Sequence, residues 1–253
     1  MICVISPAKK MSVQFSPTLG LSQPIFTDDA QVLLSAAREK SVEDLQGLMH
    51  ISEKLAVLNH ERFQAMQLND STVQHAAVSL FAGDTFVGLD AKSWDEAQLE
   101  YAQSHLRILS GLFGLLRPLD RISPYRLEMG TKFQNSRGKD LYSFWGNQLS
   151  KALNEIMGQD PILVNLASQE YFKAIDQASL DATVVTPQFK EWRNGKLKII
   201  SFSAKRARGM MAKFIVQNKL KSIDQIKHFS EAGYQFSPEH SSNNSLVFAR
   251  DAV

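Results

Sequence analysis

The sequence predicts a single-domain α/β protein in which helices surround a central mixed sheet. Short apolar runs alternate along the chain with segments whose apolar residues recur three and four positions apart, the period of a helix. An Asn-Gly pair at 194–195 lies between two strand-like runs, which indicates at least one antiparallel pair of strands. No linker rich in Gly or Ser divides the 253 residues, so we expect one domain over 1–253.

Five short apolar runs are the predicted strands, because runs of this length suit strands that are buried in a sheet. They lie at 2–6, 162–167, 182–187, 196–203 and 245–250. The predicted helices lie at 28–39, 52–66 and 93–109. Ser93 with Glu96 three residues later has the pattern of a capping box, and we expect this third helix to continue to about Ser110.

Composition argues against several classes of protein. No apolar stretch approaches the ~20 residues that a membrane helix requires, so no membrane span is expected. The single cysteine, Cys3, cannot form an internal disulfide, and no secretory leader is recognised, which favours the cytoplasm. The six histidines show no spacing of three or four and Cys-x-x-Cys is absent, so we expect neither a metal site nor a cofactor.

Positive charge is concentrated in one segment. Residues 190–221 contain ten basic residues and one acidic residue, a net charge of +9 in a chain whose net charge is +2. Such a run is typical either of a solvated face or of a surface that binds an anionic partner.

The second half of that segment predicts an amphipathic helix. Its apolar face consists of Ala204, Ala207, Met210, Met211, Phe214 and Ile215. Its basic face consists of Lys205, Arg206, Arg208, Lys213 and Lys219. Gly209 lies within the basic face, where it would admit either a nucleic-acid backbone or a closely packed segment of the protein.

Three strand-like runs are followed by a serine and then by lysine. Ser6 precedes Lys9 and Lys10, Ser168 precedes Lys173, and Ser203 precedes Lys205 and Arg206. Because ligands of open α/β sheets bind outside the carboxyl ends of parallel strands, the pattern predicts a basic pocket for phosphate. The alternative interpretation is that each serine caps a helix and each lysine is solvated.

An apolar turn with two glycines follows the third predicted helix. Gly111, Leu112, Phe113 and Gly114 resemble the turn of a helix-hairpin-helix element, in which backbone N–H groups face phosphate, although two residues separate the glycines here. The alternative is a buried helix stop. Basic residues that suit phosphate surround this turn, namely Arg107, Arg117, Arg121, Arg126, Lys132 and Arg137.

Six blocks of sequence together resemble the peroxide-stress YaaA family. They are M-I-C-V-I-S-P-A-K-K at 1–10, L-R-I-L-S-G-L-F-G-L-L-R-P-L-D at 106–120, P-Y-R-L-E-M-G at 124–130, G-K-D-L-Y-S-F-W-G at 138–146, V-N-L-A-S-Q-E-Y-F-K at 164–173 and I-I-S-F-S-A-K-R-A-R-G-M-M at 199–211. The resemblance implies a cytoplasmic bacterial protein of the hydrogen-peroxide response that limits damage from iron and peroxide. It also implies one α/β domain with a basic cleft, a helix-hairpin-helix element at Gly111–Gly114 and DNA binding.

Two function classes remain open. In the first, the protein binds DNA through its phosphate backbone without reading sequence. The residues predicted to do so are Lys9, Lys10, Arg107, Gly111, Leu112, Phe113, Gly114, Arg117, Arg121, Arg126, Lys205, Arg206 and Arg208.

In the second class, the cleft is the active site of an enzyme that acts on a nucleotide or a damaged nucleobase. The candidate groups are Ser6, Lys9, Ser168, Glu170, Tyr171, Lys173 and Lys205, with Asp84 and Glu128 as possible acid or base. The chain contains no G-x-S-x-G, G-x-x-x-x-G-K-[ST] or G-x-G-x-x-G motif, so catalysis is the less favoured prediction.

Overall fold

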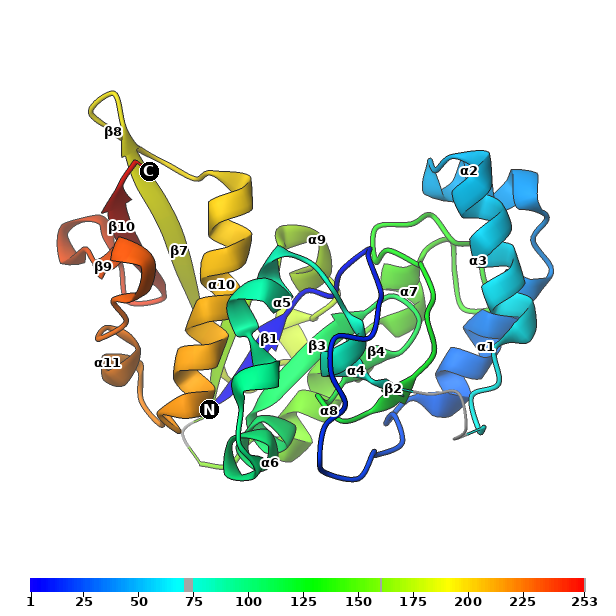
Figure 1. The fold of residues 1–253 in the computed structure, drawn as a ribbon, viewed down its shortest axis with the longest axis horizontal. Helices are drawn as coiled ribbons and strands as arrows, with labels where there is room; N and C mark the ends of the chain where they lie inside the picture. Colours follow the sequence, from blue (N-terminus) through cyan, green and yellow to red (C-terminus); the bar gives the residue numbers. More distant parts are fainter. Residues whose placement is uncertain (71–74, 160, 253) are drawn as a thin grey trace.

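A mixed sheet forms the centre of the molecule (Figure 1). The computed structural model describes residues 1–70, 75–159 and 161–252. Within them the strands follow the order β4-β3-β1-β6-β7-β10-β9, and β8 pairs with β7. Their bounds are β1 (Ile2–Ile5), β3 (Leu106–Ser110), β4 (Gly114–Leu116), β6 (Ile162–Leu166), β7 (Thr183–Arg193), β8 (Lys196–Lys198), β9 (Gln235–Phe236) and β10 (Ser245–Asp251). A separate small sheet pairs β2 (His75–Ala76) with β5 (Arg121–Ile122).

The strand directions confirm a mixed sheet. Strands β3, β1, β6, β7 and β10 are parallel to one another, whereas β4, β8 and β9 pair antiparallel with β3, β7 and β10, respectively. Asn194 and Gly195 join β7 to β8 with φ angles of 52° and 69°, the left-handed conformation that a tight hairpin turn requires. The predicted hairpin is therefore confirmed, although β7 continues to Arg193, well beyond the predicted 182–187.

Helices cover the sheet and extend the molecule at one end. Their bounds are α1 (Thr27–Arg38), α2 (Val42–Met49), α3 (Glu53–Ala65), α4 (Ala77–Leu80), α5 (Asp84–Leu89), α6 (Glu96–His105), α7 (Leu141–Trp145), α8 (Gln148–Ile156), α9 (Gln169–Phe172), α10 (Ser201–Gln217) and α11 (Ile223–Ile226). Figure 1 shows α1, α2 and α3 together at one end and the hairpin of β7 and β8 at the other. A single α/β domain results, as the sequence predicts.

Of the helix predicted at 93–109 only residues 96–105 are helical in α6, and the predicted capping box of Ser93 with Glu96 is wrong. Helix α6 begins at Glu96, capped by Asp95 in a capping box with Gln98, and it ends at His105. Residues 106–110 then form strand β3, every residue of which is buried and which pairs in parallel with β1. Pairing with the buried central strand supplies the backbone hydrogen bonds that the helix would have given, and it places the apolar run in the core.

Residues 196–203, which the sequence predicts as one strand, form a short strand and the start of a helix. Strand β8 ends at Lys198, and α10 begins at Ser201. The apolar residues after β8 do not continue the sheet, since Ile199 and Phe202 are exposed. The amphipathic pattern of α10 is confirmed: Ala204, Ala207, Met211 and Ile215 are buried, while Lys205 and Arg206 are exposed.

Helix α10 crosses α5 in backbone contact, and two glycines make this contact possible. A Cβ atom on Gly209 would lie 1.9 Å from the Thr85 carbonyl oxygen, and one on Gly88 would lie 2.1 Å from the Arg206 carbonyl oxygen. Close packing against the protein, rather than a nucleic-acid backbone, therefore explains Gly209. Lys213 of α10 adds an ion pair of 3.0 Å with Asp90, the C-cap residue that follows α5.

A buried carboxylate fixes the start of α10 to the sheet. Glu191 of β7 is 1% exposed, and its carboxylate accepts hydrogen bonds from Arg250 at 2.7 Å and from Arg193 at 2.8 Å. Burial alone would raise the pKa of Glu191, but hydrogen bonds from Arg250, Arg193 and Ser203 outweigh it and lower the pKa to about 2. Ser203 thus contributes to the fold at this point, as a hydrogen-bond partner of Glu191.

Replacement of the Glu191 carboxylate by an amide should make the free energy of unfolding less dependent on pH. The pKa of Glu191 is lower in the folded state than in the unfolded state. The carboxylate therefore contributes fully to the free energy of unfolding above its unfolded-state pKa, and this contribution is lost as the pH falls from about 5 to about 2. We expect Glu191→Gln to lower the free energy of unfolding by about 3 kcal/mol at pH 7 and by progressively less at pH 4 and pH 3. Urea denaturation at these three pH values measures the difference. Glu155→Gln, at an exposed position, is the matched control, and an equal loss at every pH would contradict the assignment.

Candidate functional site

A cavity of about 440 Å³ opens at the carboxyl ends of β1 and β6. The chain leaves β1 toward β3 on one side and leaves β6 toward β7 on the other, so the two neighbouring strands diverge here. In open α/β sheets such a switch point is where ligands bind. The residues that line this switch-point cavity are Ser6, Pro7, Ala8, Lys9, Lys10, Ala82, Gly83, Asp84, Thr85, Glu128, Ser168, Glu170, Tyr171, Lys205 and Arg208.

Segments far apart in the sequence therefore meet in one place. The residues after β1, the residues after β6 and the start of α10 are the three segments in which the sequence shows serine followed by lysine. Lys173 lies outside this cavity. Its ammonium is 4.7 Å from the centre of the Tyr142 ring, and it lines a neighbouring cavity instead. Ser203 also lies outside, beside Glu191.

The two serines tie the strand ends together. The Ser6 hydroxyl donates to Ser168 Oγ at 3.3 Å, and the Ser168 backbone N–H donates to Ser6 Oγ at 2.8 Å. Ser168 Oγ also accepts the backbone N–H of Tyr171 at 3.4 Å, which caps α9. The capping interpretation thus holds for Ser168, and both hydroxyls position the wall of the cavity.

The cavity contains both signs of charge, so the prediction of a purely basic pocket needs correction. Lys9, Lys10, Lys205 and Arg208 are accompanied by Asp84, Glu128 and Glu170. Glu128 accepts ion pairs from Lys9 at 2.7 Å and from Arg126 at 2.8 Å. The Glu170 carboxylate accepts the backbone N–H of Gly130 at 3.0 Å. Two of the three carboxylates are thus engaged in holding the loop at 128–130 against the cavity.

Electrostatics fix the protonation states of two lining groups. Burial would raise the pKa of Glu128, but hydrogen bonds and charges from Lys9 and Arg126 outweigh it, so the pKa is lowered and the group is a carboxylate. Burial, together with nearby Tyr125 and Glu170, raises the pKa of Tyr171 well above its usual value. The phenol of Tyr171 therefore stays protonated at neutral pH.

No helix-hairpin-helix element forms at Gly111–Gly114, where the sequence predicts one. The turn at Gly111–Gly114 joins strands β3 and β4, and all four of its residues are buried. Ser110 Oγ accepts the Phe113 N–H at 2.8 Å, and the Gly111 carbonyl accepts the Trp145 indole N–H at 3.1 Å. A turn buried in this way offers no N–H groups to phosphate, so Gly111, Leu112, Phe113 and Gly114 are residues of the core.

Most of the neighbouring arginines are also engaged within the protein. Arg107 is 4% exposed and donates to the carbonyls of Gln103 and Leu106, and its burial lowers its pKa to about 10. Arg117 pairs with Asp120 at 2.9 Å and donates to the Gln23 carbonyl. The other intramolecular partners are Gln23 Oε1 for Arg121, Glu128 for Arg126 and Asp29 for Arg137. The burial of Arg107 argues against its prediction as a phosphate contact, whereas phosphate contact by Arg117, Arg121 and Arg126 stays a prediction.

The remaining sequence predictions concern thiol, metal and membrane chemistry. Cys3 is fully buried in β1, and burial raises the pKa of its thiol to about 12. In residues 1–70, 75–159 and 161–252, no three His, Cys, Asp or Glu side chains are grouped as metal ligands would be. Over the same ranges, no helix has both the length and the apolar character needed to cross a membrane.

Sequence reasoning missed the segment at 82–85, which forms one wall of the cavity through Ala82, Gly83 and Thr85. Of its residues, only Asp84 was predicted from the sequence to be a functional group, as a possible acid or base. The segment matches no motif, and its only signal is Gly-Asp at the start of a short apolar helix.

Known proteins resemble this chain over nearly its whole length. Residues 1–240 match the family described as "Peroxide stress protein YaaA". A "UPF0246 protein" of Legionella pneumophila (strain Corby) is 49% identical over 255 residues, with 99% of each chain covered. Proteins of the same description from Saccharophagus degradans and Dinoroseobacter shibae are 46% and 49% identical, over 99% of this chain and 99% and 95% of their own. The chain therefore belongs to the peroxide stress protein YaaA family.

Proposed function

We propose that this member of the peroxide-stress family is a cytoplasmic protein that binds DNA through the phosphate backbone, without strong sequence preference, and so limits peroxide- and iron-dependent damage. The observation that carries the proposal is the convergence of Lys9 and Lys10 with Lys205 and Arg208 at the switch-point cavity. Arg206 adds an exposed guanidinium on the same turn of α10. The buried turn at 111–114 has no part in the proposed surface.

These cations suit phosphate better than base edges. The Lys9 side chain is 65% exposed, so its ammonium can reach beyond its ion pair with Glu128. Lysine is a mobile point charge that follows phosphate, whereas sequence is read by side chains held rigidly against base edges. Two basic segments that line one cavity could both contact a sugar-phosphate chain, and binding of this kind depends on charge and not on sequence.

The proposal is tested by comparing the affinity of the protein for DNA with a charged backbone and for DNA with a neutral backbone. Fluorescence anisotropy at 50 mM salt would compare two labelled duplexes of unrelated sequence with a third in which one strand carries neutral methylphosphonate linkages. We expect the two phosphate duplexes to bind with affinities within about threefold of each other and the neutral-backbone duplex to bind much more weakly, because non-specific binding comes from phosphate contacts. Equal binding of the neutral duplex, or binding of one sequence alone, would refute backbone recognition.

The carboxylates in the cavity favour a second candidate, an enzyme that acts on a nucleotide or a damaged nucleobase. Phosphate binding alone does not require Asp84 and Glu170 beside four cations, whereas acid–base chemistry uses such groups. Mass spectrometry of oxidised-base oligonucleotides and nucleotides after incubation with the protein would test it. The expected result is a product that Asp84→Asn abolishes, and the absence of any product would eliminate this candidate.

A further inference from the structure

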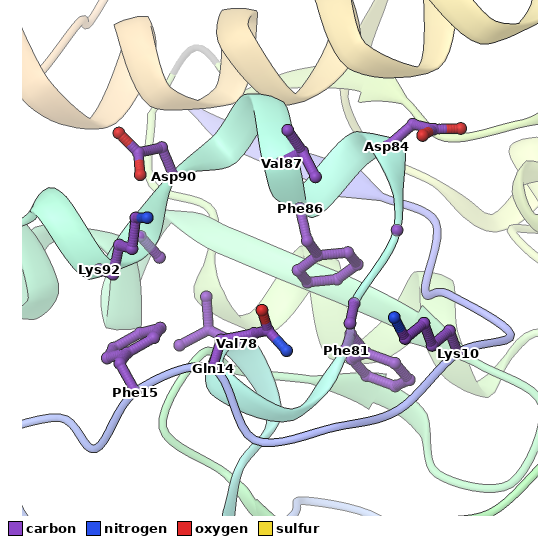
Figure 2. A pocket seen from close by; sticks show the side chains of 13 residues that line it. Lys10, Gln14, Phe15, Val78, Phe81, Asp84, Phe86, Val87, Asp90 and Lys92 are labelled. Atoms are coloured by element: carbon purple, nitrogen blue, oxygen red, sulfur yellow. The ribbon is translucent and has the colours of Figure 1, made fainter.

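A second cavity, of about 350 Å³, opens beside the switch-point cavity (Figure 2). The two cavities share Lys10, Ala82, Gly83 and Asp84 as a common wall. The two cavities are therefore neighbours, separated by this wall. The second cavity lies within the size range of small-molecule sites, which is about 300–1,000 Å³.

The walls of this second cavity are apolar and aromatic. Figure 2 shows the rings of Phe15, Phe81 and Phe86 in the lining, with Lys10 and Lys92 at its two ends, and Phe81 and Phe86 are 1% and 8% exposed. Phe81 and Phe86 contact each other at 5.4 Å between ring centres, which fixes their orientation. Val87 is also part of the lining, and it is 59% exposed. The exposed side chain of Val87 and the partly exposed ring of Phe15 form the accessible apolar part of this lining.

We propose that the second cavity holds one unpaired nucleobase of the bound DNA while Lys10 contacts the adjoining phosphate. This inference rests on the proposed DNA binding and names the part of the DNA that enters the site. Bases stack on aromatic side chains, and phosphates pair with lysine, so a nucleotide unit matches an aromatic cavity joined to a cationic one. No bond forms or breaks in this step.

The polar groups at the opening fit a base edge. The Gln14 side chain lies at the opening in Figure 2, where its amide nitrogen donates to the Ser12 carbonyl at 2.7 Å and to Ser12 Oγ at 2.8 Å, and Asp84 lies on the common wall. The Gln14 amide oxygen and the Asp84 carboxylate can both accept hydrogen bonds from the N–H groups of a base edge. Asp90 also borders the cavity, but its carboxylate is paired with Lys213 at 3.0 Å, which reduces its repulsion of a phosphate. In the described residues, no carboxylate lies within 4.0 Å of the ammonium of Lys10 or Lys92.

A cavity-filling substitution tests the inference. Three labelled duplexes would be titrated by anisotropy: a fully paired duplex, the same duplex with a one-nucleotide bulge, and one in which the bulged nucleotide is abasic. The wild-type protein should bind the base-containing bulge about tenfold more tightly than the abasic bulge, since stacking requires the base. Val87→Trp should remove this difference and leave affinity for the paired duplex within about twofold of wild type.

Two further variants make the experiment decisive. Val57→Trp introduces the same side chain at an exposed position of α3 outside both cavities, and it should behave as the wild type. Phe15→Ala removes one wall and should also reduce the preference for the base-containing bulge, which covers the case in which Val87→Trp fails to fold.

The possible outcomes separate the inference from the proposed function. If the wild type binds both bulges equally, or if a folded Val87→Trp keeps the preference, the second cavity does not hold a base, while binding of the paired duplex still supports the proposed function. If the wild type binds none of the three duplexes, both are wrong. If free mononucleotides compete but bulged DNA shows no preference, the cavity is a nucleotide site and the inference fails.

Discussion

Replacement of Gly209 by alanine should lower the free energy of unfolding by about 3 kcal/mol or more. The added Cβ would lie 1.9 Å from the Thr85 carbonyl oxygen and 2.7 Å from the Leu89 nitrogen, both of which are backbone atoms. Backbone cannot rotate away as a flexible side chain can, so α10 and α5 would have to separate. The gain in helix propensity from glycine to alanine is only about 1 kcal/mol, and the overlap outweighs it.

The same substitution at a second helical glycine provides the control. Gly47 lies in α2 with no atom within 4 Å of the position of its Cβ, so Gly47→Ala should stabilise the protein by up to about 1 kcal/mol. Urea denaturation followed by circular dichroism measures both variants. A Gly209→Ala protein as stable as the wild type would show that the two helices are not in the contact described.

Reversal of charge at Lys205 and Arg206 should weaken DNA binding at 50 mM salt by about 100-fold. The double variant Lys205→Glu/Arg206→Glu removes two cations at the start of α10 and replaces them with two anions that repel phosphate. Both side chains are exposed, and neither has an ion pair in the described residues, so we expect the fold to be retained. Anisotropy with a labelled duplex measures the change.

A second double variant, at the other end of the basic segment, distinguishes the effect of direct contact with DNA from the effect of the protein's net charge. Lys219→Glu/Lys221→Glu makes the same change in net charge at two exposed lysines after the end of α10. We expect it to lower affinity by less than about fivefold. Equal losses in the two double variants would mean that net charge, and not the switch-point cavity, governs binding.

Local patterns predict the fold well where pairing and burial agree with them. The short apolar runs at β1, β6 and β10 and the Asn-Gly turn are found where the sequence indicates them. Leu106–Ser110 shows the opposite case, because an apolar run of this length suits a helix or a strand and only the neighbouring strand β1 decides between them. The error at these five residues changes a predicted DNA-binding element into a buried β-hairpin.

The location of the site follows from a general rule, whereas its chemistry does not. Parallel strands bring their carboxyl ends to one edge, so Lys9 and Ser168 could be placed together from the strand pattern alone, whereas Lys205 reaches the cavity from α10 and not from the end of a parallel strand. The partner of Lys9 could not be predicted, because Glu128 lies 119 positions further along the chain and follows no strand of the central sheet. Similarly, Gly209 requires Thr85 to explain it, and their contact exists only in the folded protein.

The dependence of DNA affinity on salt tests the central claim most directly. The surface contains Lys9, Lys10, Lys205, Arg206 and Arg208, and if each contacts one phosphate, log affinity should fall linearly with log salt with a slope of about −4.5. Affinity would then decrease about 500-fold between 50 and 200 mM salt, and the slope of Lys205→Glu/Arg206→Glu would be shallower by about 2. A slope near zero, or an unchanged slope in that variant, would contradict phosphate binding at the switch-point cavity.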